Sequence, residues 1–167
     1  MSYRAESGLV NHSDAIRWYD EHGRALLAYA SALLRDPSAA EDVLHQVFLN
    51  VLRGRAAITG APQPYLFRAV RNAALNHIRG QSREVELPDG GAWLESPDGS
   101  KETAMALESA LKTLPAEQRE VVVLKIWGEL TFEEAAAVIG ISPNTAASRY
   151  RYGLEKLREV WKQEGRS

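Results

Sequence analysis

Two asparagines lie four residues apart in a stretch that is rich in arginine and contains no acidic residue. Asn72 and Asn76 would share one face of a helix, because residues four apart are neighbours on a helix surface. Amide side chains can hydrogen-bond the Watson–Crick edge of an unstacked base, and arginines can bind phosphates and stack on bases. The nearest arginines are Arg68, Arg71 and Arg79. This set suits binding of a single nucleic-acid strand, and a merely solvated polar face is the alternative.

A second polar set follows a short segment with the features of a helix-turn-helix. Thr131 with Glu134 predicts a capping box, Gly140 a left-handed helix end, and Ser142 the cap of the next helix. The side chains predicted to face outward near the start of that helix, where such motifs enter the major groove, are Asn144, Thr145, Ser148, Arg149, Arg151 and Tyr152. Either arginine could read guanine while the other binds phosphate. The alternative is an ordinary helix pair with a solvated basic face.

The elements that must position these residues are all helices. No segment alternates apolar and polar residues with the period of a strand, so we predict an all-α protein. Apolar residues recur at helical spacing in the stretches 13–34, 37–52, 65–79, 102–114, 115–128, 131–140 and 142–161. Gly23 is expected to break or weaken the first of these helices.

Charge and composition divide the chain into two small helical domains. The stretch 84–101 is acidic and rich in Pro and Gly, which predicts a flexible linker between a domain at 13–83 and a domain at 102–167. Residues 1–12 have no periodicity and are expected to form a loose arm. Two basic surfaces on tethered domains suggest two contacts with one extended ligand.

The composition is that of a soluble globular protein, with 45% hydrophobic and 25% charged residues, and it argues against several functions. Cysteine is absent, which excludes disulfides and thiolate chemistry and fits a reducing cytoplasm. No apolar run could cross a membrane. The scattered histidines have no partners at ligand or acid–base spacing, and no nucleotide-binding glycine motif occurs. We therefore expect no metal, no cofactor and no enzymatic activity.

Three stretches, in this order, resemble those of the extracytoplasmic-function group of bacterial RNA polymerase sigma factors. The segment 40–49, Ala-Glu-Asp-Val-Leu-His-Gln-Val-Phe-Leu, resembles the helix that docks on the clamp coiled coil of the largest polymerase subunit. The segment from Tyr65 through Arg79 resembles the promoter-melting helix of the minus-ten element, and 111–157 resembles the reader of the minus-thirty-five element.

The resemblance implies roles and partners for the residues above. Asp42, Gln46 and Phe48 would contact core polymerase, although Phe48 could equally be a core residue. The loop 59–64 would help to form a pocket for a flipped base. The implied partners are core polymerase, promoter DNA and a candidate anti-sigma factor, for a protein that is monomeric when free. Three departures from the family pattern are Tyr65 for Trp, Asn76 for Asp, and Ala146-Ala147 for Val followed by a basic residue.

Two other functions compete with a sigma factor. A stand-alone helix-turn-helix regulator would bind duplex DNA without polymerase, but it leaves the basic stretch 65–83 without a role. A helical adaptor that binds only proteins would not need Arg149 and Arg151.

Overall fold

The computed structural model describes residues 12–54, 58, 60–80 and 101–165. Within these ranges the chain forms α2 (His12–Leu34), α3 (Pro37–Leu52), α4 (Gln63–Gly80), α5 (Lys101–Lys112), α6 (Ala116–Ile126), α7 (Phe132–Ile139) and α8 (Pro143–Gly165). The predicted all-α fold is confirmed. The predicted arm and linker lie outside the described residues, apart from His12 and Lys101. None of the described helices has the length and apolar character that crossing a bilayer would require.

Helices α2 and α3 follow each other almost without a loop. Arg35 takes a left-handed conformation with a φ of 59° at the end of α2, and the Asp36 carboxylate then accepts hydrogen bonds from the first backbone N–H groups of α3. The predicted break at Gly23 is wrong, because α2 runs through it without interruption. Burial of flanking residues such as Trp18 and Leu26 outweighs the roughly 1 kcal/mol that glycine costs in a helix.

The turn between α7 and α8 forms as its sequence predicts. Thr131 and Glu134 make both hydrogen bonds of a capping box, Gly140 has a φ of 91°, and the Ser142 hydroxyl accepts the N–H of Thr145 at 3.1 Å. Ala146 is fully buried where α8 leaves the turn. Further along, a Cβ at Gly153 would lie 2.9 Å from Cγ2 of Val122, so only glycine allows α8 to approach α6 this closely.

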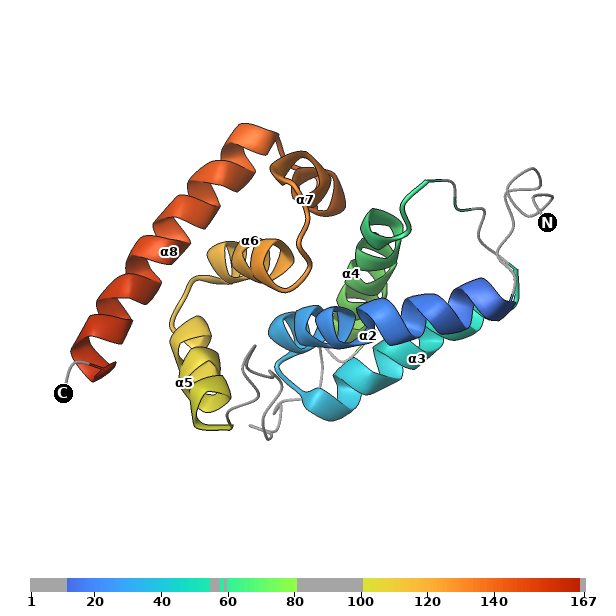
Figure 1. Cartoon of the computed structure of the whole chain (residues 1–167), viewed down its shortest axis with the longest axis horizontal. Helices are drawn as coiled ribbons and strands as arrows, with labels where there is room; N and C mark the ends of the chain where they lie inside the picture. The colour runs from blue at the N-terminus through green and yellow to red at the C-terminus, as the bar shows by residue number, and fades with distance from the viewer. Residues whose placement is uncertain (1–11, 55–57, 59, 81–100, 166–167) are drawn as a thin grey trace.

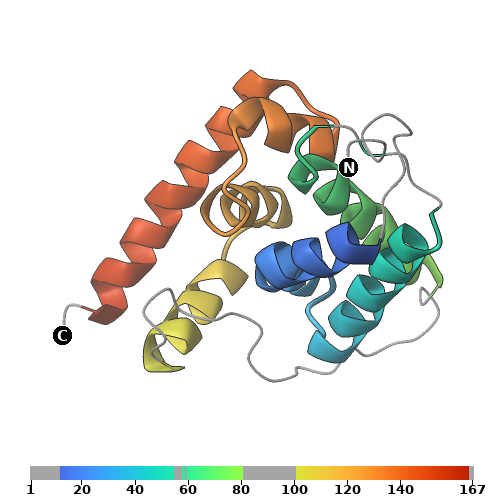
Figure 2. The same cartoon turned by 45° about the vertical axis from the view of Figure 1, so that its right-hand side comes forward.

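Helix α6 is central to the whole molecule. Figures 1 and 2 show α6 between α2 and α8, with α7 beside the first turns of α4. The run Val121–Leu124 is completely buried on every side of the helix. A helix that is apolar all round needs cover on all faces. Helix α8 and its neighbours cover one side of α6, and α2 covers the other.

The two halves of the chain, α2–α4 and α5–α8, therefore share one hydrophobic core instead of standing apart as separate bundles. The ring of Phe67 on α4 packs edge-on against Tyr29 of α2, with centroids 5.6 Å apart. The same ring lies against the loop after α6, where a Cβ at Gly128 would come within 3.1 Å of the Phe67 Cζ atom. This packing fixes the orientation of α4 relative to the helix-turn-helix.

Candidate nucleic-acid interface

The start of α8 presents a polar surface to solvent. Asn144, Thr145, Arg151 and Tyr152 are exposed, whereas Ser148 and Arg149 are partly buried. The Arg151 guanidinium lies over the Tyr152 ring, 5.0 Å from its centroid. Neither Arg149 nor Arg151 forms an ion pair with Glu134 or Glu155, all four of which lie in the described part of the chain. The described part of the chain therefore does not neutralise the charges of Arg149 and Arg151 by an ion pair.

The amide face of α4 is also exposed. Asn72 and Asn76 both point outward, and Arg79 donates a hydrogen bond from Nη2 to the Asn76 side-chain oxygen. At about 100° per residue, Arg68 and Arg79 lie on the same side of the helix as the two amides. The structure brings these four side chains together on one face, as the sequence predicts.

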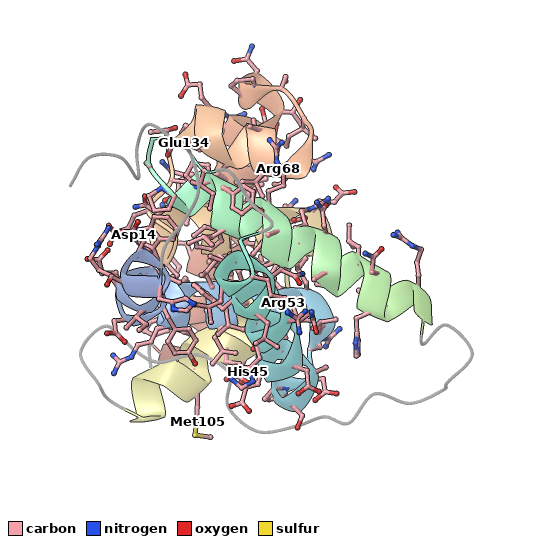
Figure 3. All side chains as sticks on the ribbon, turned by 90° about the vertical axis from the view of Figure 1, so that its right-hand side faces the viewer. Asp14, His45, Arg53, Arg68, Met105 and Glu134 are labelled. Carbon is pink, nitrogen blue, oxygen red and sulfur yellow. The ribbon has the colours of Figure 1, made fainter. Side chains whose placement is uncertain are left out.

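Arg71 differs from this prediction, because it points toward the C-terminal half instead of outward. Its Nε atom donates to Oε2 of Glu120 at 2.5 Å, and its side chain is only 22% exposed. The backbone explains the difference, since Arg71 is turned about 60° from Arg68, away from the side of the amides. Arg68 is exposed but also reaches across, and its Nη2 atom donates to the Ala137 carbonyl at 2.8 Å. Figure 3 shows Arg68 where α4 meets α7.

Glu120 is the centre of a buried polar cluster. Tyr29 donates its hydroxyl to the same Oε2 atom at 2.5 Å, and Glu120 is 7% exposed. Burial, followed by the negative charge of Glu120, raises the pKa of Tyr29 well above its usual value. For Arg71, burial alone would lower the pKa, but the hydrogen bond and charge of Glu120 outweigh it and the pKa is raised. The Tyr29 hydroxyl and the Arg71 guanidinium are therefore held in their ordinary protonation states.

Arg119, next in sequence, is buried without a carboxylate partner among the described contacts. Its guanidinium donates to the carbonyl of Leu111 in the last turn of α5 at 3.1 Å, to that of Leu114 in the turn after α5 at 2.9 Å, and to that of Ala32 near the end of α2 at 3.4 Å. Carbonyls at helix C-termini carry partial negative charge, which suits a cation. Burial, and then the charge of Arg35, lower the pKa of Arg119.

Helix α3 exposes an acid and an amide beside an apolar groove. Asp42 and Gln46 are exposed. The neighbouring groove, with a volume of about 470 Å³, is lined by Ala15, Ile16, Tyr19, His45, Phe48, Leu49 and Leu52. Phe48 is 6% exposed and packs edge-on against Tyr19 at 5.2 Å, so its main role is in the core, with one edge in the groove.

Sequence reasoning missed Tyr29, Glu120 and Arg119. One signal was present, since the run Val121–Leu124 predicts a helix covered on all faces. Polar residues that flank such a run are buried with it and must find partners. The neighbouring residues in the sequence do not indicate which groups these polar side chains will bind.

Comparison with known proteins identifies the family. Residues 18–84 match the family model of Sigma-70 region 2, and residues 104–157 match that of Sigma-70 region 4. The chain is 33% identical over 152 residues to the RNA polymerase sigma factor CarQ of Myxococcus xanthus, covering 85% of this chain and 86% of the relative. It is 30% identical over 147 residues to the ECF RNA polymerase sigma factor EcfG of Rhodopseudomonas palustris, covering 84% and 81%. The chain is an extracytoplasmic-function sigma factor.

Solved structures share the fold of this sigma factor. RpoE of Bartonella quintana, solved in complex with the anti-sigma factor NepR, is 24% identical with a TM-score of 0.76, covering 91% of this chain and 99% of that one. CnrH, solved with the cytosolic domain of CnrY, is 23% identical with a TM-score of 0.68, covering 97% and 95%.

The sigma factor acts in transcription initiation, as its family does. It binds core RNA polymerase, recognises promoter DNA through its region 2 and region 4 domains, and promotes strand opening. The match to region 2 contains α3 and α4, and the match to region 4 contains the helix-turn-helix.

Proposed function

We propose that the sigma factor divides its work among three helix surfaces. The outer face of α3 docks on the clamp coiled coil of the largest polymerase subunit, the amide face of α4 opens the minus-ten element, and the start of α8 reads the minus-thirty-five element. The observation that carries the proposal is that each polar set is exposed on a different helix outside the core: Asp42 and Gln46, Asn72 and Asn76, and Asn144, Thr145 and Arg151.

The docking surface combines charge with apolar area. Asp42 and Gln46 lie next to Leu49, which is 44% exposed at the edge of the groove between α2 and α3. A basic partner helix could pair with the acid and place apolar side chains in the groove. The groove residues Ile16 and Tyr19 come from α2, so the contact would include both helices.

Reversal of charge on α3 tests the docking surface. Replacing Asp42 and Gln46 by Arg should weaken binding to core polymerase about tenfold or more, because like charges would then face a basic partner. Circular dichroism and the melting temperature should stay near wild type, since both positions are exposed. Glu159→Arg, which reverses the charge of an exposed acid near the end of α8, controls for charge reversal elsewhere on the surface. Unchanged affinity in the double variant would contradict the assignment.

The amides of α4 should act after polymerase has bound. Asn72→Ala with Asn76→Ala should leave holoenzyme assembly intact and reduce permanganate reactivity of promoter thymines, because the amides would bind bases only once they are unpaired. A template with a premelted bubble should restore much of the lost transcription. Normal opening of a fully duplex promoter by this variant would count against the role of α4.

We also propose that an anti-sigma factor regulates this protein. The structural neighbour RpoE was solved with the anti-sigma factor NepR, and CnrH was solved with the cytosolic domain of CnrY. We further propose that the free protein is a monomer, that it is located in the cytoplasm with the polymerase, and that it has no catalytic activity of its own.

A further inference from the structure

Two cations of the proposed melting helix bind negative groups of the sigma factor itself. Arg71 binds the Glu120 carboxylate on α6, and Arg68 binds the Ala137 carbonyl, which belongs to the last turn of α7. The last carbonyls of a helix lack intrahelical partners and carry partial negative charge. A carboxylate and a helix C-terminus are both substitutes for what an arginine meets on a DNA backbone, which is anionic oxygen.

These contacts exist only while the two halves are packed together. Glu120 lies 91 residues from Tyr29 and 49 residues from Arg71 in sequence, and both donors belong to the N-terminal half. If the halves separated, the Glu120 carboxylate would lose its hydrogen bonds from Tyr29 and Arg71 and regain water, and Arg71 would become free. Hydrogen bonds to a charged group depend strongly on geometry, so those of Glu120 favour one orientation of α2 against α6, which the apolar contact alone would not select.

The same packing leaves the remainder of the α4 face open. Asn72, Asn76 and Arg79 stay exposed, whereas α7 lies against the beginning of α4, where Arg68 is located. With the two halves packed together, the amides that would read bases, Asn72 and Asn76, are therefore exposed. Two of the arginines that would hold the strand, Arg68 and Arg71, are already bound.

We infer that the C-terminal half is an intramolecular competitor of promoter DNA: Glu120 with Tyr29, and the end of α7, bind the arginines of α4 in the free protein and must release them before strand opening. This inference rests on the proposed role of α4 in DNA binding. Glu120 thus acts as a clasp between the halves, and not as a DNA contact.

The variant that tests the clasp is Glu120→Gln, which keeps the shape of the side chain and removes its charge. Hydrogen bonds to charged groups are usually strong enough that losing the charge should raise the open fraction by about tenfold to a hundredfold. Glu117→Gln on the same helix is the matched control, since it makes the same charge change at an exposed position. Tyr29→Phe is a milder second variant, because it removes one hydrogen bond and keeps the ring.

Opening can be measured without DNA. The sequence contains no cysteine, so Ser38→Cys and Glu159→Cys, both at exposed positions, accept a pair of spin labels, one on each half. Free wild-type protein and Glu117→Gln should give one narrow distance distribution, and Glu120→Gln should add a longer and broader one. An unchanged distribution in Glu120→Gln and Tyr29→Phe, or a broad one in wild type, would overturn the clasp.

Release of the arginines is measured with a fluorescein-labelled, AT-rich single strand of about 20 nucleotides. The full-length Glu120→Gln variant should bind this strand about tenfold more tightly than Glu117→Gln does, and Asn72→Ala should reduce the gain. If the halves open and binding does not tighten, the competition is refuted while the clasp remains as a contact. A failure of the proposed melting role would appear separately, as normal permanganate reactivity in holoenzyme with Asn72→Ala and Asn76→Ala.

Discussion

Arg71 on α4 and Arg151 on α8 differ in the surroundings of their guanidinium groups. Arg71 is mostly buried and bound to Glu120, whereas Arg151 is exposed and its guanidinium lies over the Tyr152 ring. A guanidinium on α4 therefore contributes to the stability of the closed fold, and one on α8 is available to a ligand. A helix face that is basic in the sequence is therefore not necessarily available to a ligand in the folded protein.

The largest expected effect is on stability. Arg71→Ala should lower the free energy of unfolding by about 2–4 kcal/mol, because the Glu120 carboxylate stays buried and loses its charged partner. Arg151→Ala should change it by no more than about 0.5 kcal/mol, as expected for an exposed site. Urea denaturation of the two full-length variants measures both. Similar losses in both variants would remove the distinction between the two helices.

For binding to duplex DNA, we expect the larger effect from the arginines of α8. In holoenzyme, Arg151→Ala should cost about 1–3 kcal/mol on the cognate minus-thirty-five element, and relax preference at one base pair, if Arg151 reads a guanine. Arg149→Ala should instead weaken all duplexes alike and reduce the salt dependence by about 0.9 per lost phosphate contact. Titrations at several salt concentrations on cognate and mutated elements distinguish the two roles, which could also be exchanged. Unaltered binding in both variants would refute the recognition-helix assignment.

The smallest effect concerns alkaline pH. Because the pKa of Tyr29 is raised in the folded protein, Tyr29 contributes stability that is complete below about pH 10, its usual pKa, and is lost as pH rises beyond that. The loss from this one group is at most about 1.4 kcal/mol per pH unit. Urea denaturation between pH 9 and 11 should give a shallower decline for Tyr29→Phe than for wild type. Parallel declines would mean that Tyr29 does not titrate differently in the two states.

The features predictable from sequence depend on near neighbours. The capping box of Thr131 and Glu134, the left-handed Gly140 and the cap at Ser142 each involve residues within a few positions, and all three formed. The exposed side chains of α4 and α8 followed from helical periodicity, but Arg71, Ser148 and Arg149, which were also predicted to face outward, are partly buried. Periodicity gives the direction of a side chain relative to its own helix, and says nothing of which other helix lies on that side.

The features that could not be predicted depend on the packing of the two halves. Whether Glu120 meets Tyr29 and Arg71 is decided by how α6 sits between α2 and α8, across 91 and 49 residues of sequence. The apolar run Val121–Leu124 indicates that α6 is covered all round, but many helices could supply the cover. The same holds for the groove between α2 and α3, whose residues come from two helices.

The close approach of α8 to α6 at Gly153 separates the part of α8 that can be redesigned from the part that cannot. Any side chain at Gly153 would collide with Val122, and a larger one at Ala146 would enter the core, so both positions must stay small. The exposed positions Asn144, Thr145, Arg151 and Tyr152 near the start of α8 have no such restriction. Under the proposed role of α8, substitution of these four side chains alone would change the promoter preference and leave the packing of α8 against α6 intact.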